Sequence, residues 1–319
     1  MAFRRALVSS RMLLRSRRLM SSEARLIQLN REVSEHFAAS RFAEAAASAA
    51  QAIDVAREEY GEDHFAFASA VNNLAVVVKR AGDLEKAQPL MRFALQIYEK
   101  VHGPEHLSTA SVRANLAVLL RQLWHERCLP VQSELESETA EASHGIIGYE
   151  LLDEARELLT QALKTREKAA GEQGAPDHPL VASTRGLLAS VLGRLSRRDE
   201  AEAAFTYARQ QFERHLREDE ASAEFGTLLH NFGVFRRGEC EEGAEQLLRD
   251  ALTMRARAVG EEHADFEETA NALLRLLRET GQSEKLAKLE QQLPRRWEEP
   301  GTLRQTGRIP TTDVDASVE

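Results

Sequence analysis

The chain repeats itself at a spacing of 42 residues, and this period restricts the fold more than any other feature. The phrase Asn73-Leu74-Ala75 returns 42 residues later as Asn115-Leu116-Ala117. Three linker phrases also match one another: Tyr-Gly-Glu-Asp-His (60–64), His-Gly-Pro-Glu-His (102–106) and Val-Gly-Glu-Glu-His (259–263). A fixed period of this length is typical of proteins that stack one supersecondary unit upon the next.

The residue types within the period favour helices. Ala, Leu, Glu and Arg dominate, and these residues lose little side-chain freedom in a helix. No run alternates between two faces as a strand would. We therefore predict about six antiparallel helix pairs, at residues 24–60, 64–102, 106–170, 178–216, 221–259 and 263–294.

Small residues and glycines mark how each pair is built. Ala75, Ala87 and Ala94 allow the two helices of a pair, A and B, to approach closely. Gly82 is expected in the turn between helices A and B, where a positive φ is favoured. Further glycines are expected to end the B helices: Gly61, Gly103, Gly171 and Gly260.

The repeat predicts one long solenoid, residues 23–296, with an interruption in its third pair. Residues 128–150 form an acidic insertion that contains Pro130 and a run of glutamates, and we expect a loop or short helix there. Residues 297–319 show no period and contain Pro, Gly, Thr and charged residues, so we predict a disordered tail.

The first 22 residues differ from the rest because they contain six arginines and no acidic residue. An Arg-rich, Ser-containing and acid-free start is typical of a mitochondrial transit peptide. A basic tail or a nucleic-acid-binding arm is the alternative. Without these arginines, 36 basic residues face 51 acidic ones and the net charge is −15, which disfavours nucleic acid as the partner. No apolar stretch approaches the roughly 20 residues that span a bilayer.

The best repeat resembles those of a known family. Asn72-Asn73-Leu74-Ala75, Gly82, Ala87, Pro89-Leu90 and Gly103-Pro104-Glu105-His106 are similar to the 42-residue tetratricopeptide repeats of kinesin light chains. The similarity covers about residues 64–263. It implies a right-handed superhelical α-solenoid whose A helices line a concave, polypeptide-binding groove. It does not imply a motor subunit, because the long coiled coil of a light chain is missing.

Projecting the repeat onto the A helices predicts which side chains line that groove. Asparagine amides can donate to and accept from a peptide backbone, and a basic row on an acidic body attracts acidic segments. The alternative for the basic row is purely structural, since cations in the last turn of a helix are stabilised by about 0.3–1 kcal/mol. The candidate partner-binding residues are Asn72, Asn73, Lys79, Asn115, Arg121, Arg194, His230, Asn231, Arg237, Asn271 and Arg278.

Catalytic and metal-binding motifs are not evident in the sequence. Cys128 and Cys240 lack the spacing of a zinc site, and no phosphate-binding loop, HExxH or GxSxG motif occurs. Four histidines occupy the same place in the repeat, where they would lie too far apart to share an ion: His64, His106, His178 and His263. We expect no catalytic residues, no metal and no cofactor.

These features favour a non-enzymatic scaffold or assembly factor in mitochondria, and we expect the matrix over the other compartments. It would hold a protein or peptide partner of acidic character in its groove. Three alternatives remain open. They are an accessory structural subunit of a large mitochondrial complex, a cytoplasmic adaptor resembling a kinesin light chain, and an enzyme, or the regulatory domain of an enzyme, whose catalytic part is not recognisable in the sequence.

Overall fold

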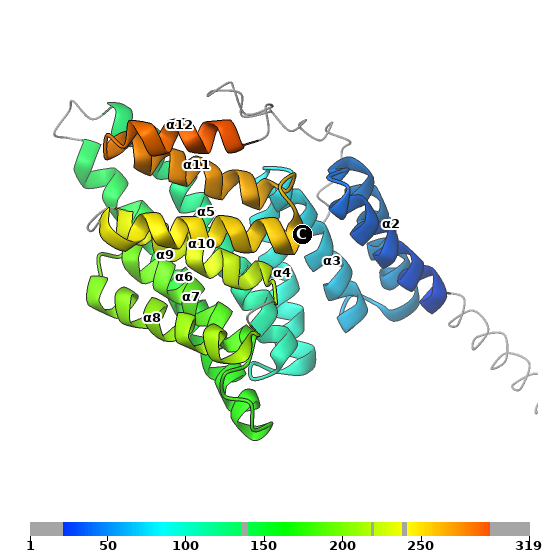
Figure 1. The fold of residues 1–319 in the computed structure, drawn as a ribbon. Helices are drawn as coiled ribbons and strands as arrows, with labels where there is room; N and C mark the ends of the chain where they lie inside the picture. The colour runs from blue at the N-terminus through cyan, green and yellow to red at the C-terminus, as the bar shows by residue number, and fades with distance from the viewer. Residues whose placement is uncertain (1–21, 135–139, 218–219, 238–240, 294–319) are drawn as a thin grey trace, which may run out of the picture. The chain divides into compact units, whose positions relative to one another are not determined.

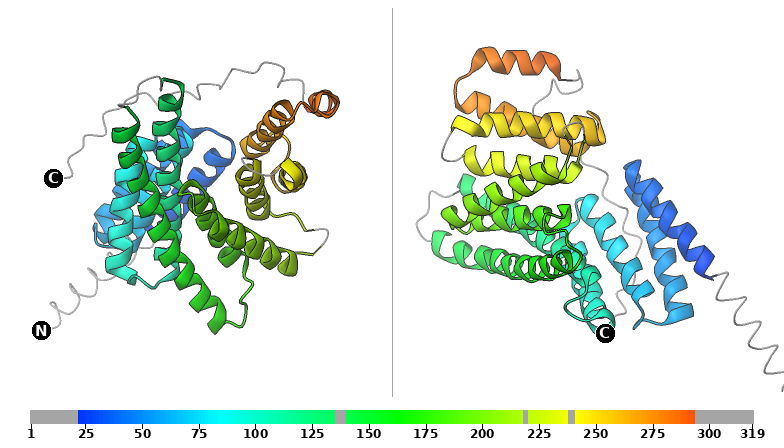
Figure 2. Two further views of the ribbon diagram at one scale, coloured as in Figure 1. Left: turned by 90° about the vertical axis from the view of Figure 1, so that its left-hand side faces the viewer. Right: turned by 60° about the horizontal axis from the view of Figure 1, so that its bottom comes forward.

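The computed structural model describes residues 22–134, 140–217, 220–237 and 241–293, and every regular element in these ranges is a helix (Figures 1 and 2). The all-α prediction is confirmed. The predicted tail and, apart from Ser22, the predicted transit peptide lie outside the described residues.

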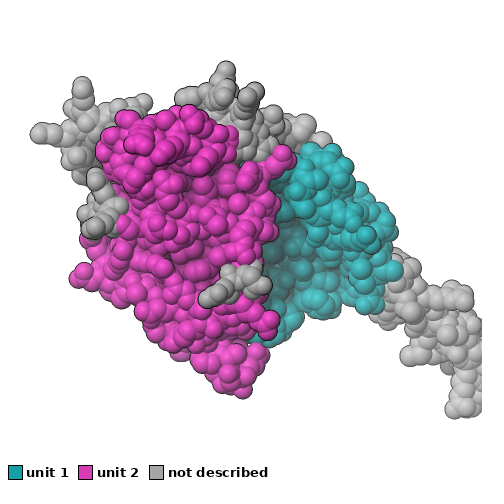
Figure 3. Space-filling view, viewed as in Figure 1, with its two compact units in different colours: residues 1–123, 304–319 teal, residues 124–303 magenta. Residues whose placement is uncertain are grey.

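The described residues divide into two compact units, and the boundary along the sequence falls between Leu123 and Trp124 (Figure 3). The first unit contains helical residues 22–38, α2 (Phe42–Tyr60), α3 (Phe65–Arg80), α4 (Leu84–His102) and the start of α5 (Leu107–Glu134). The second unit contains the rest of α5 and seven further helices. These are α6 (Ala140–Glu172), α7 (Pro179–Arg194), α8 (Arg198–His215), α9 (Ala223–Arg237), α10 (Glu241–Val259), α11 (Ala264–Glu279) and α12 (Ser283–Gln292).

Six successive pairs of A and B helices therefore follow one another within a few residues of the predicted bounds, as expected for an α-solenoid. The insertion differs from the expected loop or short helix. The backbone of α5 continues to Glu134 and α6 already begins at Ala140, so residues 128–134 and 140–150 extend the two helices. Leu, Gln, Glu and Ala are good helix formers, which explains the extension. Residues 135–139 lie outside the described part of the chain.

The turn between helices A and B adopts the left-handed conformation that the repeat predicts. Gly82 has φ +91°, and the N–H of Asp83 donates to the carbonyl of Val78 at 3.1 Å. Ser40 and Ser196 adopt the same conformation at this position, with φ +55° and +58°, although serine has a Cβ that disfavours it.

The prediction for Gly171 is wrong, whereas the other three predicted B-helix glycines do have positive φ. Gly171 lies inside the last turn of α6, and Gly174 adopts the left-handed conformation instead, with φ +69°. The linker before His178 is longer than the others, so the helix continues for another turn before it ends.

The core consists of small residues within the pairs and larger residues between them. Ala75, Ala87 and Ala94 are fully buried, as their role in helix contact predicts. In the second unit, aromatic rings join neighbouring pairs: the centroids of Phe205 and Phe232 lie 4.9 Å apart in a stacked arrangement. Burying such a side chain stabilises the fold by about 1.5–3 kcal/mol, so each pair depends on its neighbour for stability.

Candidate functional site

The repeated histidines cap the A helices, which explains why they recur. The Nδ1 atom of His64 accepts a hydrogen bond from the backbone N–H of Ala66 at 3.2 Å. His106, His178 and His263 accept in the same way from the residue two positions further on, at 3.1–3.2 Å. A helix start has unpaired N–H donors that a capping acceptor satisfies. These four histidines therefore belong to the repeat and not to a metal site.

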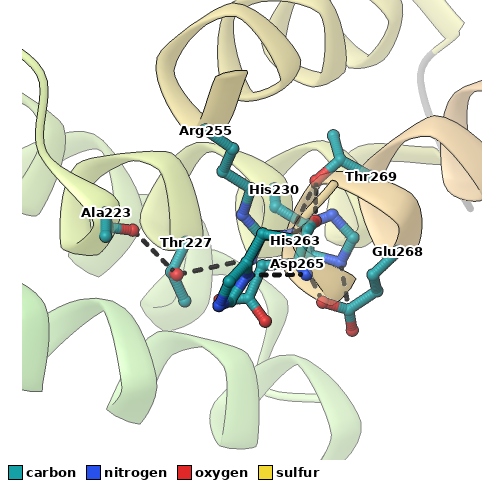
Figure 4. Close-up of polar contacts among 8 residues, drawn as sticks. All are labelled: Ala223, Thr227, His230, Arg255, His263, Asp265, Glu268 and Thr269. Carbon is teal, nitrogen blue, oxygen red and sulfur yellow. Dashed lines mark hydrogen bonds and ion pairs between the residues drawn. The ribbon is translucent and has the colours of Figure 1, made fainter. Parts of the chain in front are cut away.

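A buried arginine joins the last two helix pairs (Figure 4). Arg255 on α10 is only 3% exposed, and its Nη1 donates to the Oγ1 of Thr269 on α11 at 2.6 Å. The same nitrogen donates to the carbonyl of Asp265, and Nη2 donates to the Oγ1 of Thr227 on α9 at 3.3 Å. The carboxylate of Glu268 lies 3.3 Å from Nη1. This guanidinium bonds three helices together.

Arg166 repeats this arrangement between the third and fourth pairs. It is buried on α6 and donates to the hydroxyl of Thr184 and to the carbonyl of Leu180 on α7. Burial lowers the pKa of Arg166 below its ordinary value. The sequence reading missed both arginines, although each lies four residues after a repeated alanine of its B helix and five before a glycine. They are structural staples, because neither is exposed to a ligand.

The basic row forms a cluster in the first unit. Lys79 and Arg80 end α3, Arg121 lies on the next A helix, and Lys79 is close enough to both for their charges to act upon it. Burial, followed by repulsion from Arg80 and Arg121, lowers the pKa of Lys79 to about 8. A helix end stabilises a cation only modestly. The helix dipole alone therefore does not explain a lysine at a position where burial and neighbouring charges oppose its protonated form.

The second unit brings two predicted cations together in the same way. The pKa of Arg194 on α7 is lowered by burial and then by repulsion from Arg237 on the adjacent A helix, α9. The guanidinium of Arg194 also lies 5.4 Å from the centre of the Trp124 ring. An arginine stays charged at ordinary pH even so.

Two of the predicted cations lie beside carboxylates near the end of the described chain. Arg237 lies 3.5 Å from Glu279, and Arg278 lies 3.1 Å from Glu290. The predicted row is therefore basic, but its positive charge is partly neutralised near the end of the described chain. That it binds a partner stays a prediction.

The predicted asparagines also differ from one another in burial and in hydrogen bonding. The Nδ2 of Asn73 donates to the Oδ1 of Asn30 at 3.1 Å, which joins two successive A helices. Asn30 lies 42 residues before Asn72, so extending the repeat by one more copy would have found it. The Oδ1 of Asn72 is buried and accepts no hydrogen bond within the described structure. Asn115 is half-buried on α5.

In the second unit the corresponding positions range from buried to exposed. His230 on α9 is 6% exposed, and its Nε2 lies 3.7 Å from the Oε1 of Glu268 on α11 (Figure 4). Asn231 is half-buried and Asn271 is exposed. His230 is thus largely buried and lies beside the next A helix, and its predicted role in binding a partner stays a prediction.

Two family models for tetratricopeptide repeats match the chain. One matches residues 66–126 and the other matches residues 150–180 and 241–265. The curated proteins contain no match to the chain. The matched segments cover nearly all of α3, all of α4, most of α5, much of α6 and all of α10, so they fall on the helix pairs described above.

Several solved structures are similar to the chain at low sequence identity. BtubC (BKLC) of P. vanneervenii is 20% identical, with a TM-score of 0.48, over 85% of this chain and 89% of that one. A kinesin-light-chain-type protein of Podosopora anserina with nearly identical TPR-like repeats is 17% identical, with a TM-score of 0.48, over 74% and 95%. The assembly chaperone of RpL4, Acl4, is 16% identical, with a TM-score of 0.31, over 82% and 99%.

None of the described helices combines the length and the apolar character that crossing a membrane requires. The described residues also contain no group of three or more His, Cys, Asp or Glu side chains that could hold a metal ion. The chain therefore contains tetratricopeptide repeats at residues 66–126, 150–180 and 241–265, and such repeats are an arrangement suited to protein–protein interaction.

Proposed function

We propose that the protein is a non-enzymatic scaffold, working in mitochondria, that holds an acidic segment of a partner polypeptide against its A helices. The observation that carries the proposal is the cluster of Lys79, Arg80 and Arg121 in a chain of net charge −9. If Lys79 served only to stabilise the end of α3, its position would be unfavourable, because burial and two arginines oppose its charge. An acidic ligand would remove that opposition.

The physics of the cluster supports an acidic segment over a neutral one. Carboxylates brought close to Lys79 would favour its protonated form, so binding would take up protons near pH 8. Charge attraction between exposed groups is screened over about 10 Å at 0.1 M salt. The affinity should therefore fall as salt is added.

Titration with a labelled, glutamate-rich peptide tests the proposal, with a lysine-rich peptide of equal length for comparison. We expect the glutamate-rich peptide to bind the wild type, and Lys79→Met and Arg121→Gln to weaken that binding several-fold. Lys86→Met on α4 is the matched control, because Lys86 pairs with Asp83 at 2.9 Å and lies outside the A-helix row. Equal binding of both peptides, or equal loss in the control, would refute the basic-surface proposal.

The six arginines of residues 1–22 support the mitochondrial part of the proposal. Fluorescent fusions with and without these residues test it. We expect mitochondrial staining only in the longer fusion, and cytoplasmic staining of both fusions would contradict it. Native gel migration separates a scaffold from an accessory subunit, since a subunit should run entirely within one large complex.

A further inference from the structure

Exposed apolar side chains gather beside a row of rings where the B helices of the first unit end and its A helices begin. The ring centroids of Phe65 and His102 lie 5.9 Å apart, and those of His102 and His106 are stacked at 4.5 Å. Phe65 is 48% exposed, Val101, which precedes His102, is 38% exposed, and Leu107, which follows His106, is 42% exposed. We call these five residues the edge patch. Of the seven large hydrophobic side chains that are exposed in the described residues, three belong to it.

The repeat does not require a patch of this kind. The residue that follows the capping histidine is Phe65 or Leu107 in the first unit, but Pro179 or Ala264 in the second. The histidine accepts its backbone hydrogen bond in all four A helices. Capping therefore needs no large apolar residue here. Single exposed apolar side chains are ordinary, whereas a contiguous group is typical of an interaction surface.

The segments that carry the edge patch are acidic. Residues 57–65 and 99–107, together with Arg113, contain six acidic and three basic residues, a net charge of −3 with the histidines neutral. Each of the three bases lies beside a carboxylate of these segments: Arg57 beside Glu62 at 3.0 Å, Lys100 beside Asp63 at 2.7 Å and Arg113 beside Glu99 at 2.6 Å. Glu58 is exposed on the last turn of α2 and forms no ion pair within the described structure. Negative charge therefore remains beside the exposed rings.

We infer that the edge patch docks a segment of a partner polypeptide that carries arginine together with leucine or a similar apolar side chain. A guanidinium group stacks on aromatic rings and pairs with carboxylates, and this surface offers both. The apolar side chains of the segment would cover Phe65 and Leu107 and remove their surface from water. Lysine would pair with the carboxylates, but its compact ammonium group stacks on rings less well.

This surface is separate from the one in the proposed function, and the inference does not rest on that proposal. Phe65 begins α3, whereas Lys79 lies in its last turn. The two are about 21 Å apart along the helix axis, at a rise of about 1.5 Å per residue. The segments that they attract also have opposite charge.

Fluorescence anisotropy of the full chain with a labelled peptide of arginine, leucine and serine tests the inference. One control peptide replaces leucine by serine, and a second replaces arginine by lysine. We expect the first peptide to bind about fivefold more tightly than either control, because each control lacks one of the two contacts. Equal binding of the three peptides would overturn the inference.

Variants locate the binding on the chain. Phe65→Ser and Leu107→Ser should each weaken binding about fivefold, because nearly half of each side chain is open to being covered. Leu180→Ser is the matched control, since Leu180 is 47% exposed in the first turn of α7, in the second unit. Glu58→Gln should weaken binding about twofold at low salt, and Lys79→Met should leave it unchanged. An equal loss in Leu180→Ser and Leu107→Ser would contradict the assigned surface.

Hydrogen exchange of the wild-type chain gives the same information without a substitution that could disturb the fold. The peptide should slow amide exchange in residues 58–66 and 99–108, and protection confined to other segments would refute the inference. The chain's own residues 1–21 are the competing occupant, because they combine six arginines with leucine, valine and methionine. A chain that begins at Ser22 should bind the peptide as tightly as the full chain. A several-fold gain in affinity would assign the edge patch to the chain's own segment and overturn the docking of a partner.

Discussion

Replacing Lys79 by methionine is expected to stabilise the protein at neutral pH. Methionine keeps an unbranched apolar side chain of similar length and removes the charge. The pKa of Lys79 falls from 10.5 to about 8 on folding. At 1.36 kcal/mol per pKa unit, keeping this lysine charged in the folded state costs about 3 kcal/mol. The free energy of unfolding of Lys79→Met should exceed that of the wild type by up to this amount at pH 7.

The pH dependence has a definite sign. Below pH 8 the lysine is charged in both the folded and the unfolded chain, so the full cost is present. Between pH 8 and 10.5 the unfolded chain keeps the proton that the folded chain has lost, so wild-type stability rises with pH. Above pH 10.5 both states are neutral and the cost is gone. The advantage of the variant should therefore shrink from about 3 kcal/mol at pH 7 towards zero near pH 10.5.

Urea unfolding of both proteins at several pH values, followed by circular dichroism, measures this difference. All other titrating groups are common to the two chains, so their contributions cancel in the difference. Lys86→Met is the control and should show no comparable gain, because Lys86 is exposed and paired with Asp83. A variant that is less stable than the wild type at pH 7, or a difference that stays constant from pH 7 to 10.5, would refute the reasoning.

Further substitutions test a helix cap, a turn and a buried arginine of the repeat by thermal and chemical unfolding. His64→Ala should cost about 1 kcal/mol by removing a helix cap, and His64→Asn should restore most of it; equal losses would contradict the capping role. Ser196→Gly should stabilise by about 0.5–1 kcal/mol, since glycine avoids the left-handed strain but loses more backbone entropy, and a destabilised variant would contradict this. Arg255→Met should cost about 2 kcal/mol because buried acceptors lose their donor, and adding Thr269→Val should recover part of the loss; purely additive losses would refute the coupling.

Much of the fold could be predicted because the information is local. A helix A and a helix B follow from helix-forming residues of the right length, and the turn between them follows from a residue such as Gly82. The insertion was predicted less well, because helix-forming residues beside a proline are compatible with either a loop or a longer helix. Gly171 was assigned wrongly for a similar reason: a longer linker moved the left-handed position to Gly174.

The candidate site could be predicted only as a set of positions. The repeat places Lys79, Arg121 and Arg278 at equivalent points of their A helices, and therefore does not distinguish them. Only the tertiary structure distinguishes a partly buried lysine between two arginines from cations such as Arg278 that have a carboxylate partner. Residues one repeat away contribute the burial and the neighbouring charges of such a cation. These shift its pKa, and its own position in the repeat does not reveal them.

The sequence by itself determined the period, the helix pairs and the places of the capping histidines, because helix formation and turn geometry depend on residues within a few positions of one another. The tertiary structure decided which repeated side chains remain available to a partner. It engages Asn73 with Asn30, and it uses Arg255 as a staple for Thr269. It also leaves Lys79 beside like charges. These outcomes depend on which side chains of adjacent repeats meet, and packing alone brings them together.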